Sequence, residues 1–110
     1  MKVKISEATP LQLNYLVAST LGTGTYWHSK EFRDTFSPTT NWAQGGPIIE
    51  REGISVVQEG DSAPWVGSAY DYTAQDWYNH TPGLTPLIAA MRCYVACKLG
   101  DEVEVPEGLL

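Results

Sequence analysis

The chain has 110 residues, of which 43% are hydrophobic and 18% charged, and this size and composition predict one globular domain spanning residues 1–110. Seven basic and thirteen acidic residues give a net charge of −6. Because long nucleic acids are bound mainly by neutralising phosphates with Lys and Arg, this charge argues against a DNA- or RNA-binding protein. The sequence has no run of about 18 apolar residues and no apolar signal core near its start, so we expect a cytosolic protein without membrane contact.

The first forty residues predict a strand, a helix and a loop. Residues 1–5 alternate lysine with apolar residues, as a short strand with one solvated face does. Thr9 followed by Gln12 has the spacing of a capping box, which predicts a helix that ends near Gly22. Gly, Thr, Ser and Pro then dominate residues 23–40, which predicts a loop with one short strand around Tyr26.

The middle of the chain predicts a turn and a β-hairpin. The run Gly45-Gly46-Pro47 predicts a turn, followed by a single helical turn that ends at Gly53. Residues 54–58 and 63–70 predict two antiparallel strands joined by a turn at Gly60 and Asp61. Residues 71–84 are polar and rich in aromatic side chains, and we interpret them as a connection.

The segment from Thr85 to Val105 predicts the central helix and the last strand. Thr85 is a helix N-cap residue, Pro86 suits the first helical turn, and Gly100 follows the last apolar residue of the helical pattern. Only Arg92 and Lys98 carry charge within the helix, so we expect it to be largely buried. The complete pattern predicts an α+β fold, in which a small, mostly antiparallel sheet of four to five strands packs against two helices.

No residue pattern in the chain predicts catalysis, a metal site or a cofactor. Cys93 and Cys97 are four residues apart inside an apolar helix, which is typical of small buried residues and not of the knuckle that holds zinc. Residues 50–52 place an arginine between two glutamates, but such clusters are usually ion pairs at the surface, and no nucleophile accompanies them.

A binding site for a small ligand is the stronger prediction. The glycine turn offers backbone N–H groups beside polar and aromatic side chains, and these groups are able to hold an anion. Aromatic faces elsewhere can stack on a nucleobase. The candidate ligand-binding residues are Asn41, Trp42, Gln44, Gly45, Gly46, Arg51, Trp65, Trp77 and Arg92. For each tryptophan, ordinary core packing is the alternative, and for the glycines it is a structural turn.

Two long stretches closely resemble the NinX-like family, small proteins of lambdoid phages and enterobacterial prophages. They are NWAQGGPIIEREGI (residues 41–54) and TPLIAAMRCYVACKLGDEVEVPEGL (residues 85–109), and the opening MKVKISEA with the helix after it fits as well. Segments 23–40 and 58–84 match less well. The resemblance implies an accessory protein made in the cytoplasm of the infected bacterial host, and it supplies no catalytic residues.

Small acidic phage accessory proteins often interfere with host machinery, and two hypotheses follow. The first is a non-enzymatic sponge that sequesters a small nucleotide-derived immune signal of the host, in a site shared between the subunits of a homo-oligomer. The alternative is a protein-binding inhibitor or adaptor that acts on a host enzyme. A pocket lined by Trp42 and Arg51 favours the sponge, whereas an open aromatic patch favours a protein partner. Arg92 belongs to the site only if it faces the Gly45-Gly46 turn.

Overall fold

The computed structural model describes residues 1–59, 65–71 and 74–109, without the side chains of residues 71 and 78–80. The elements, including two 3₁₀ helices labelled η, are β1 (Lys2–Lys4), η1 (Ile5–Glu7), α1 (Pro10–Thr20), η2 (Gly24–His28), α2 (Lys30–Thr35), α3 (Trp42–Glu52), β2 (Ile54–Gln58), β3 (Trp65–Asp71), β4 (Asp76–Gly83), α4 (Pro86–Leu99) and β5 (Glu102–Glu104). The α+β class is confirmed, and the predicted hairpin turn at Gly60 and Asp61 lies outside the described residues.

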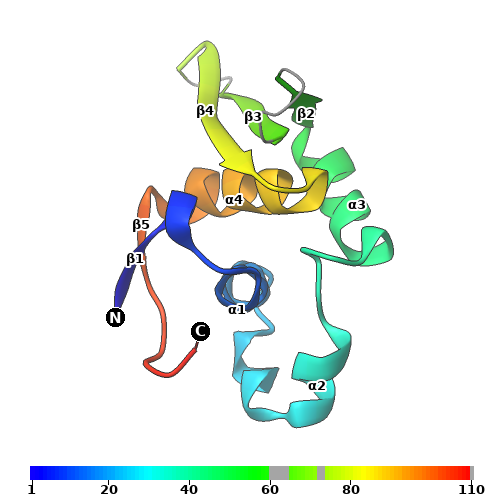
Figure 1. The fold of residues 1–110 in the computed structure, drawn as a ribbon, viewed down its shortest axis with the longest axis vertical. Helices are drawn as coiled ribbons and strands as arrows, with labels where there is room; N and C mark the ends of the chain where they lie inside the picture. The colour runs from blue at the N-terminus through cyan, green and yellow to red at the C-terminus, as the bar shows by residue number, and fades with distance from the viewer. Residues whose placement is uncertain (60–64, 72–73, 110) are drawn as a thin grey trace.

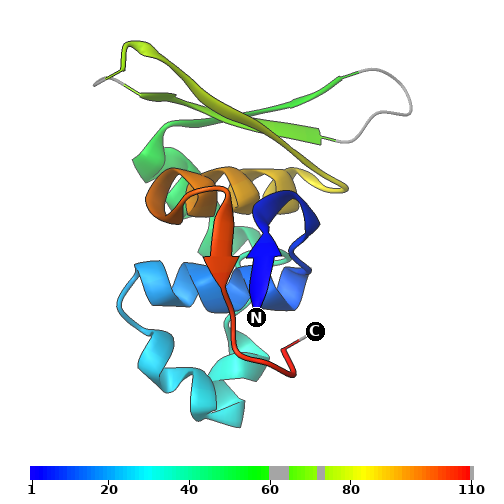
Figure 2. The same ribbon diagram turned by 90° about the vertical axis from the view of Figure 1, so that its left-hand side faces the viewer.

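The five strands among the described residues divide between two antiparallel sheets. Strands β2, β3 and β4 form one sheet in that order, and β1 pairs with β5 in the other, with Val3 opposite Val103. The larger sheet forms one outer layer of the molecule, α4 lies beneath it, and α1 lies beneath α4 (Figures 1 and 2). The small sheet lies beside the two helices and brings the chain ends together: the N-terminal amine donates to the Val105 carbonyl oxygen at 3.1 Å.

Helix α4 is the centre of the fold, as its sequence predicts. The Thr85 hydroxyl accepts a hydrogen bond from the Ile88 backbone N–H, and eight of the fourteen helical residues are buried. The helix lies very close to the sheet: a Cβ atom added at Gly67 would lie 2.5 Å from the Ala89 carbonyl oxygen. Small residues on both sides of this contact therefore set the distance between the two layers.

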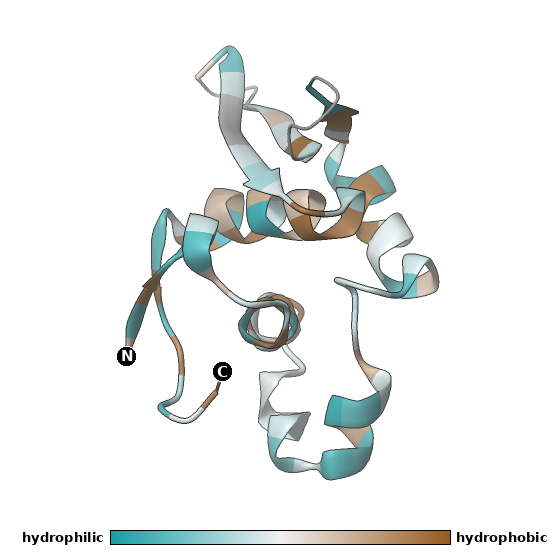
Figure 3. Ribbon diagram, in the orientation of Figure 1, coloured by the Kyte–Doolittle hydropathy of each residue, from teal (hydrophilic) through white to brown (hydrophobic). Residues whose placement is uncertain are grey.

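The hydrophobic core lies where α4 meets α1, the sheet and the N-terminal segment. The predicted capping box of α1 is present, with reciprocal hydrogen bonds between Thr9 and Gln12. Apolar residues colour much of α1 and α4 brown in Figure 3, whereas α2 is mainly hydrophilic. The larger core side chains are Ile5, Leu13, Leu16, Val17, Ile48, Ile54, Met91, Tyr94, Val95, Val103 and Val105.

The prediction of a loop with a strand around Tyr26 is wrong. Residues 24–28 form η2 and residues 30–35 form α2. Buried Trp27 packs edge-on against Tyr15 of α1 with ring centroids 5.5 Å apart, and its carbonyl oxygen accepts a hydrogen bond from Arg33. Contacts between distant aromatic residues thus stabilise helical turns that the local composition does not favour.

Two other local predictions are also wrong. Residues 42–52 form a continuous helix, α3, so Gly45-Gly46-Pro47 lies inside a helix and is not a turn; Asn41 caps this helix and Gly53 ends it. Most of the predicted connection at residues 71–84 is strand β4, whose pairing with β3 supplies the hydrogen bonds that the local pattern does not reveal.

Candidate functional site

The beginnings of α3 and α4 enclose a hollow of about 280 Å³ on the protein surface. Trp42, the first residue of α3, forms one side of it and remains 57% exposed. The other lining residues come from the loop before α3 and from the first turn of α4, and they are Thr39, Thr40, Thr85, Pro86, Leu87 and Ile88. We name this feature the Trp42 hollow.

Helix α3 reaches α4 at the hollow because residue 45 is a glycine. A Cβ atom at Gly45 would lie 2.5 Å from the Pro38 carbonyl oxygen and 2.6 Å from Leu87 Cδ2. At Gly46 the nearest atom to an added Cβ is Trp42 Cε3, at 4.0 Å, which is ordinary contact. Gly45 is therefore required for helix packing, and the backbone of neither glycine forms the anion-binding turn that the sequence predicts.

Polar side chains fix the loop that forms the second wall of the hollow. Asn14 of α1 accepts hydrogen bonds from the backbone N–H and the hydroxyl of Thr39, at 3.2 and 2.9 Å. Gln44 accepts from the Ser37 N–H at 2.6 Å and donates to the Thr35 carbonyl oxygen at 2.7 Å. Gln44, a predicted ligand-binding residue, thus holds the loop in place.

No residue that lines the Trp42 hollow carries a charge. Arg51, the nearest cation along α3 in the sequence, lies at the other end of that helix, where it donates to the Glu52 carboxylate at 2.9 Å. Glu52 also pairs with Lys98 at 3.1 Å. Partial burial raises the pKa of Glu52, but the hydrogen bonds from Arg51 and Lys98 outweigh that effect and leave it lowered. The bridge from α3 to α4 is therefore structural.

Arg92 does not face the predicted glycine site. Its two terminal nitrogens donate to the carbonyl oxygens of Pro82 and Ala8, at 2.8 and 2.9 Å. The loss of hydration lowers the pKa of this guanidinium. Arg92 therefore connects three segments of the fold. Because it does not face the Gly45-Gly46 turn, α4 has a structural role here.

Trp65 and Trp77 lie on the three-stranded sheet, on opposite faces. Trp65 is opposite Gly83 in the register, on the face that α4 covers, whereas exposed Trp77 is opposite Tyr70 on the other face. The two tryptophans are therefore not positioned to stack on the same ligand. Of the predicted site residues, those of residues 41–46 lie together at the start of α3, and the other four lie elsewhere.

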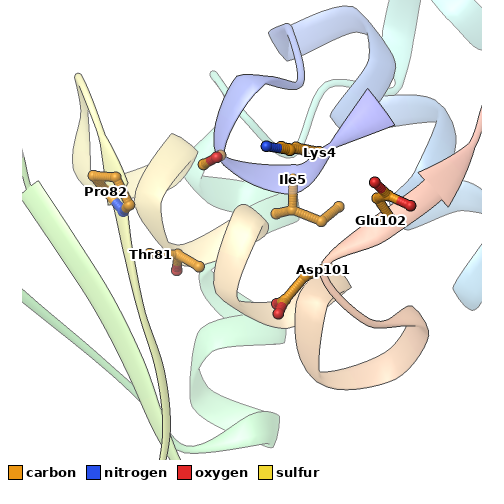
Figure 4. Close-up of a pocket in the computed structure, with 7 residues that line it drawn as sticks. Lys4, Ile5, Thr81, Pro82, Asp101 and Glu102 are labelled. Carbon is orange, nitrogen blue, oxygen red and sulfur yellow. The ribbon is translucent and has the colours of Figure 1, made fainter. Parts of the chain in front are cut away.

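A second hollow, of about 470 Å³, lies between the two sheets (Figure 4). Its lining residues are Lys4, Ile5, Ser6, Thr81, Pro82, Asp101 and Glu102. Lys4 is opposite Glu102 in the strand register, and the Thr81 hydroxyl lies 3.2 Å from the Gly67 carbonyl oxygen. The Thr81 hydroxyl thus already has a partner within the fold. No local sequence pattern indicates this hollow, because it depends on the pairing of β1 with β5.

The described residues contain no group of three or more His, Cys, Asp or Glu side chains arranged to hold a metal ion. Cys93 and Cys97 form no disulfide, and Cys93 is fully buried. Among the described helices, none combines the length and the apolar character needed to cross a membrane.

Comparison with known proteins identifies the family. No curated protein matches the chain. The family model described as bacteriophage P22 NinX matches residues 4–98, which include all of the first stretch that carries the resemblance and residues 85–98 of the second. The chain therefore belongs to the phage NinX family.

Proposed function

We propose that this protein is a non-enzymatic phage accessory protein that binds a host protein in the bacterial cytoplasm, with Trp42 as its anchor. The observation that carries the proposal is the uncharged hollow beside an exposed tryptophan. Tryptophan is among the residues that most often dominate binding energy at protein interfaces. A partner's apolar side chain would enter the hollow between the two helices while its backbone packs on Trp42.

The size of the hollow suits one side chain or one base. Pockets for small molecules usually enclose about 300–1,000 Å³. The Trp42 hollow, at about 280 Å³, lies just below that range. It has room for one aromatic or aliphatic side chain, or for a single nucleobase.

The absence of charge in the lining of the Trp42 hollow favours a protein side chain over a nucleotide. The phosphates of a nucleotide-derived signal are normally bound by Arg, Lys or a metal ion. The hollow contributes none of these, and Arg51 and Arg92 are engaged elsewhere. A neutral, mainly apolar group is the better match.

The sponge remains the second candidate because of one feature. The exposed ring of Trp42 lies beside the exposed residues Thr40 and Thr85, which suits stacking on a base and hydrogen bonding to its edge. In that arrangement the phosphates would extend beyond the hollow, and a second subunit would have to supply the cations. This candidate therefore requires a homo-oligomeric site.

Affinity capture from a host lysate distinguishes the two candidates. The wild-type chain is compared with Trp42→Ala and with Trp77→Ala, a matched control that removes a similarly exposed tryptophan from another surface: the residues are 57% and 53% exposed. We expect wild type and Trp77→Ala to retain a stoichiometric host protein, and Trp42→Ala to lose it. Titration of the purified partner should show at least about a 30-fold weaker Kd for Trp42→Ala, the effect of a hot-spot residue.

Two outcomes would overturn the protein-binding proposal. One is capture of the same partner with wild-type affinity by Trp42→Ala. The other is the absence of any stoichiometric protein together with a nucleotide found by native mass spectrometry on protein purified from infected cells. Calorimetry with cyclic oligonucleotides and cyclic ADP-ribose compounds would then test the sponge. For the sponge we expect the wild-type chain to release heat on binding and Trp42→Ala to show no heat of binding.

A further inference from the structure

The hollow between the two sheets, which we name the inter-sheet hollow, has the size of a small-molecule site. Its volume of about 470 Å³ lies within the ~300–1,000 Å³ that such sites usually enclose. Its walls come from the end of β1 with η1, from the end of β4, and from the start of β5 with the residue before it. A ligand there would contact three segments that are distant in the sequence.

Hydrogen bonds hold these walls in place. The backbone N–H of Ile5 donates to the Asp101 carbonyl oxygen at 2.9 Å, which connects η1 to the start of β5. Arg92 of α4 donates to the Pro82 carbonyl oxygen at 2.8 Å and thereby fixes the end of β4. Because the site is formed before a ligand arrives, binding needs little ordering of the backbone.

The inter-sheet hollow presents two opposite charges that do not neutralise each other. Lys4 and Glu102 are directly opposite in the strand register, a position in which opposite charges usually interact. Among the ion pairs of the described residues, however, none includes either side chain. Figure 4 shows the Lys4 amine and the Glu102 carboxylate pointing away from each other. Both groups therefore remain available to a ligand.

This combination of charges disfavours ligands of a single charge. The carboxylates of Asp101 and Glu102 repel a phosphate or another simple anion, whereas the Lys4 amine repels a simple cation. A zwitterion matches both signs. Thr81 suits its ammonium group as well: the hydroxyl proton is directed to a backbone carbonyl, which leaves the oxygen free to accept a hydrogen bond.

We propose that the inter-sheet hollow binds a small zwitterion, namely a free amino acid with an apolar side chain. The carboxylates of Asp101 and Glu102 hold the ligand's ammonium group, and the Lys4 amine holds its carboxylate. The apolar side chain of the ligand packs on Ile5 and Pro82, which line the same hollow. No residue lines both this hollow and the Trp42 hollow, so the proposal is independent of the proposed function.

Nuclear magnetic resonance titration of the ¹⁵N-labelled chain with leucine tests the proposal. Leucinamide and N-acetylleucine are the matched probes, because the first lacks the carboxylate charge and the second lacks the ammonium charge. Leucine should shift the backbone amide signals of Ser6, Thr81 and Glu102 in a saturable way. Each probe should bind at least about tenfold more weakly, because each loses one hydrogen bond between charged groups.

Substitutions identify the side chain that binds each end of the ligand. Lys4→Gln should abolish the preference for leucine over leucinamide, and Glu102→Gln the preference for leucine over N-acetylleucine. Lys2→Gln and Glu104→Gln are the controls: these residues are opposite each other on the same two strands but do not line the hollow. Both controls should leave the Kd for leucine unchanged. All four positions are exposed, and circular dichroism checks that each variant folds.

Three results would overturn the proposal. The first is the absence of saturable shifts with leucine up to about 10 mM. The second is equal binding of leucine and either probe, which would show that one charge is sufficient. The third is an equal loss of binding for the control variants, which would indicate a general effect of surface charge. Capture of a host protein through Trp42 is unaffected by any of these results.

Discussion

The guanidinium of Arg92 donates a hydrogen bond of 2.9 Å to the carbonyl oxygen of Ala8, a residue 84 positions earlier in the chain. Its other terminal nitrogen reaches the Pro82 carbonyl oxygen on β4. Arg92 therefore links the segment before α1 to the three-stranded sheet through α4. Because an arginine stays charged even when its pKa is lowered, both hydrogen bonds have a charged donor and are stronger than neutral ones.

We predict that Arg92→Ala lowers the free energy of unfolding by about 2–3 kcal/mol, because two backbone carbonyls lose their charged donor. Arg92→Lys should lose about half as much, since an ammonium group cannot reproduce the fork of two nitrogens. Urea unfolding at neutral pH measures both. Arg51→Ala is the control: its pair with Glu52 lies at the surface, so its effect should be much smaller than that of Arg92→Ala. Equal losses for Arg92→Ala and Arg51→Ala would contradict the structural role of Arg92.

The elements that the sequence predicts correctly are those with local signals. Helices α1 and α4 begin directly after Thr9 and Thr85, whose side chains cap them, and α4 ends directly before Gly100, as predicted. Strand β1 follows from the alternation of lysines with apolar residues. Strands β2 and β3 pair antiparallel, as the turn residues between them predict. Each of these signals depends on neighbours within a few residues, which a single sequence contains.

The incorrect predictions concern elements that distant contacts stabilise. Two glycines and a proline disfavour a helix at residues 45–47, yet α3 forms because Gly45 allows it to pack on Pro38 and Leu87. The predicted ligand-binding residues are separated in the fold for the same reason. Residues 41–46 are adjacent in sequence and stay together, whereas Arg51, Arg92 and the two sheet tryptophans have positions set by long-range packing.

The two adjacent glycines of α3 should respond in opposite ways to the same substitution. At Gly45 an alanine methyl would overlap the Pro38 carbonyl and Leu87, so we expect Gly45→Ala to destabilise the fold by about 1–3 kcal/mol. At Gly46 the methyl meets only ordinary contact, and we expect a gain of up to about 1 kcal/mol, because glycine is a poor helix former. Thermal and urea unfolding compare the two variants. A similar loss for both would indicate that residues 42–52 are not one helix packed as described.

The two cysteines should differ in reactivity although they share one helix. Burial, together with the neighbouring Cys97, raises the pKa of the Cys93 thiol to about 12. Cys97 is exposed. Since the thiolate is the reactive form, iodoacetamide at neutral pH should modify one cysteine in the folded chain and two in urea. Mass spectrometry measures the count, and Cys97→Ser should abolish labelling of the folded protein. Modification of Cys93 at the rate of an unfolded thiol would contradict its burial.

The raised pKa of Cys93 also predicts a loss of stability in alkali. In the unfolded chain this thiol titrates near its ordinary pKa of about 8.5, whereas in the folded chain it stays protonated up to about pH 12. Between these values the unfolded state binds fewer protons, so the free energy of unfolding falls as pH rises, by at most about 1.4 kcal/mol per pH unit from this group. Urea unfolding between pH 8 and 10 measures the slope, with Cys93→Ala as the comparison; we expect the variant to show the shallower decline. Equal slopes for the two chains would show that the thiol does not titrate differently in the folded state.

The final prediction connects the buried side chain of Asn14 to binding at the Trp42 hollow. Asn14 Oδ1 accepts two hydrogen bonds from Thr39, which is 2% exposed and lines the hollow. Asn14→Ala leaves the Thr39 N–H without this acceptor, so we expect a loss of about 1–3 kcal/mol in the free energy of unfolding. The wall that Thr39 forms should loosen as well and weaken binding of a captured host protein severalfold, although Asn14 does not line the hollow. Asn14→Asp keeps the acceptor oxygen and should retain more of the affinity. If Asn14→Ala lowers the free energy of unfolding but leaves the affinity for the host protein at the wild-type value, the partner binds elsewhere. A binding surface that includes Thr39 should change when Thr39 loses its hydrogen bonds to Asn14.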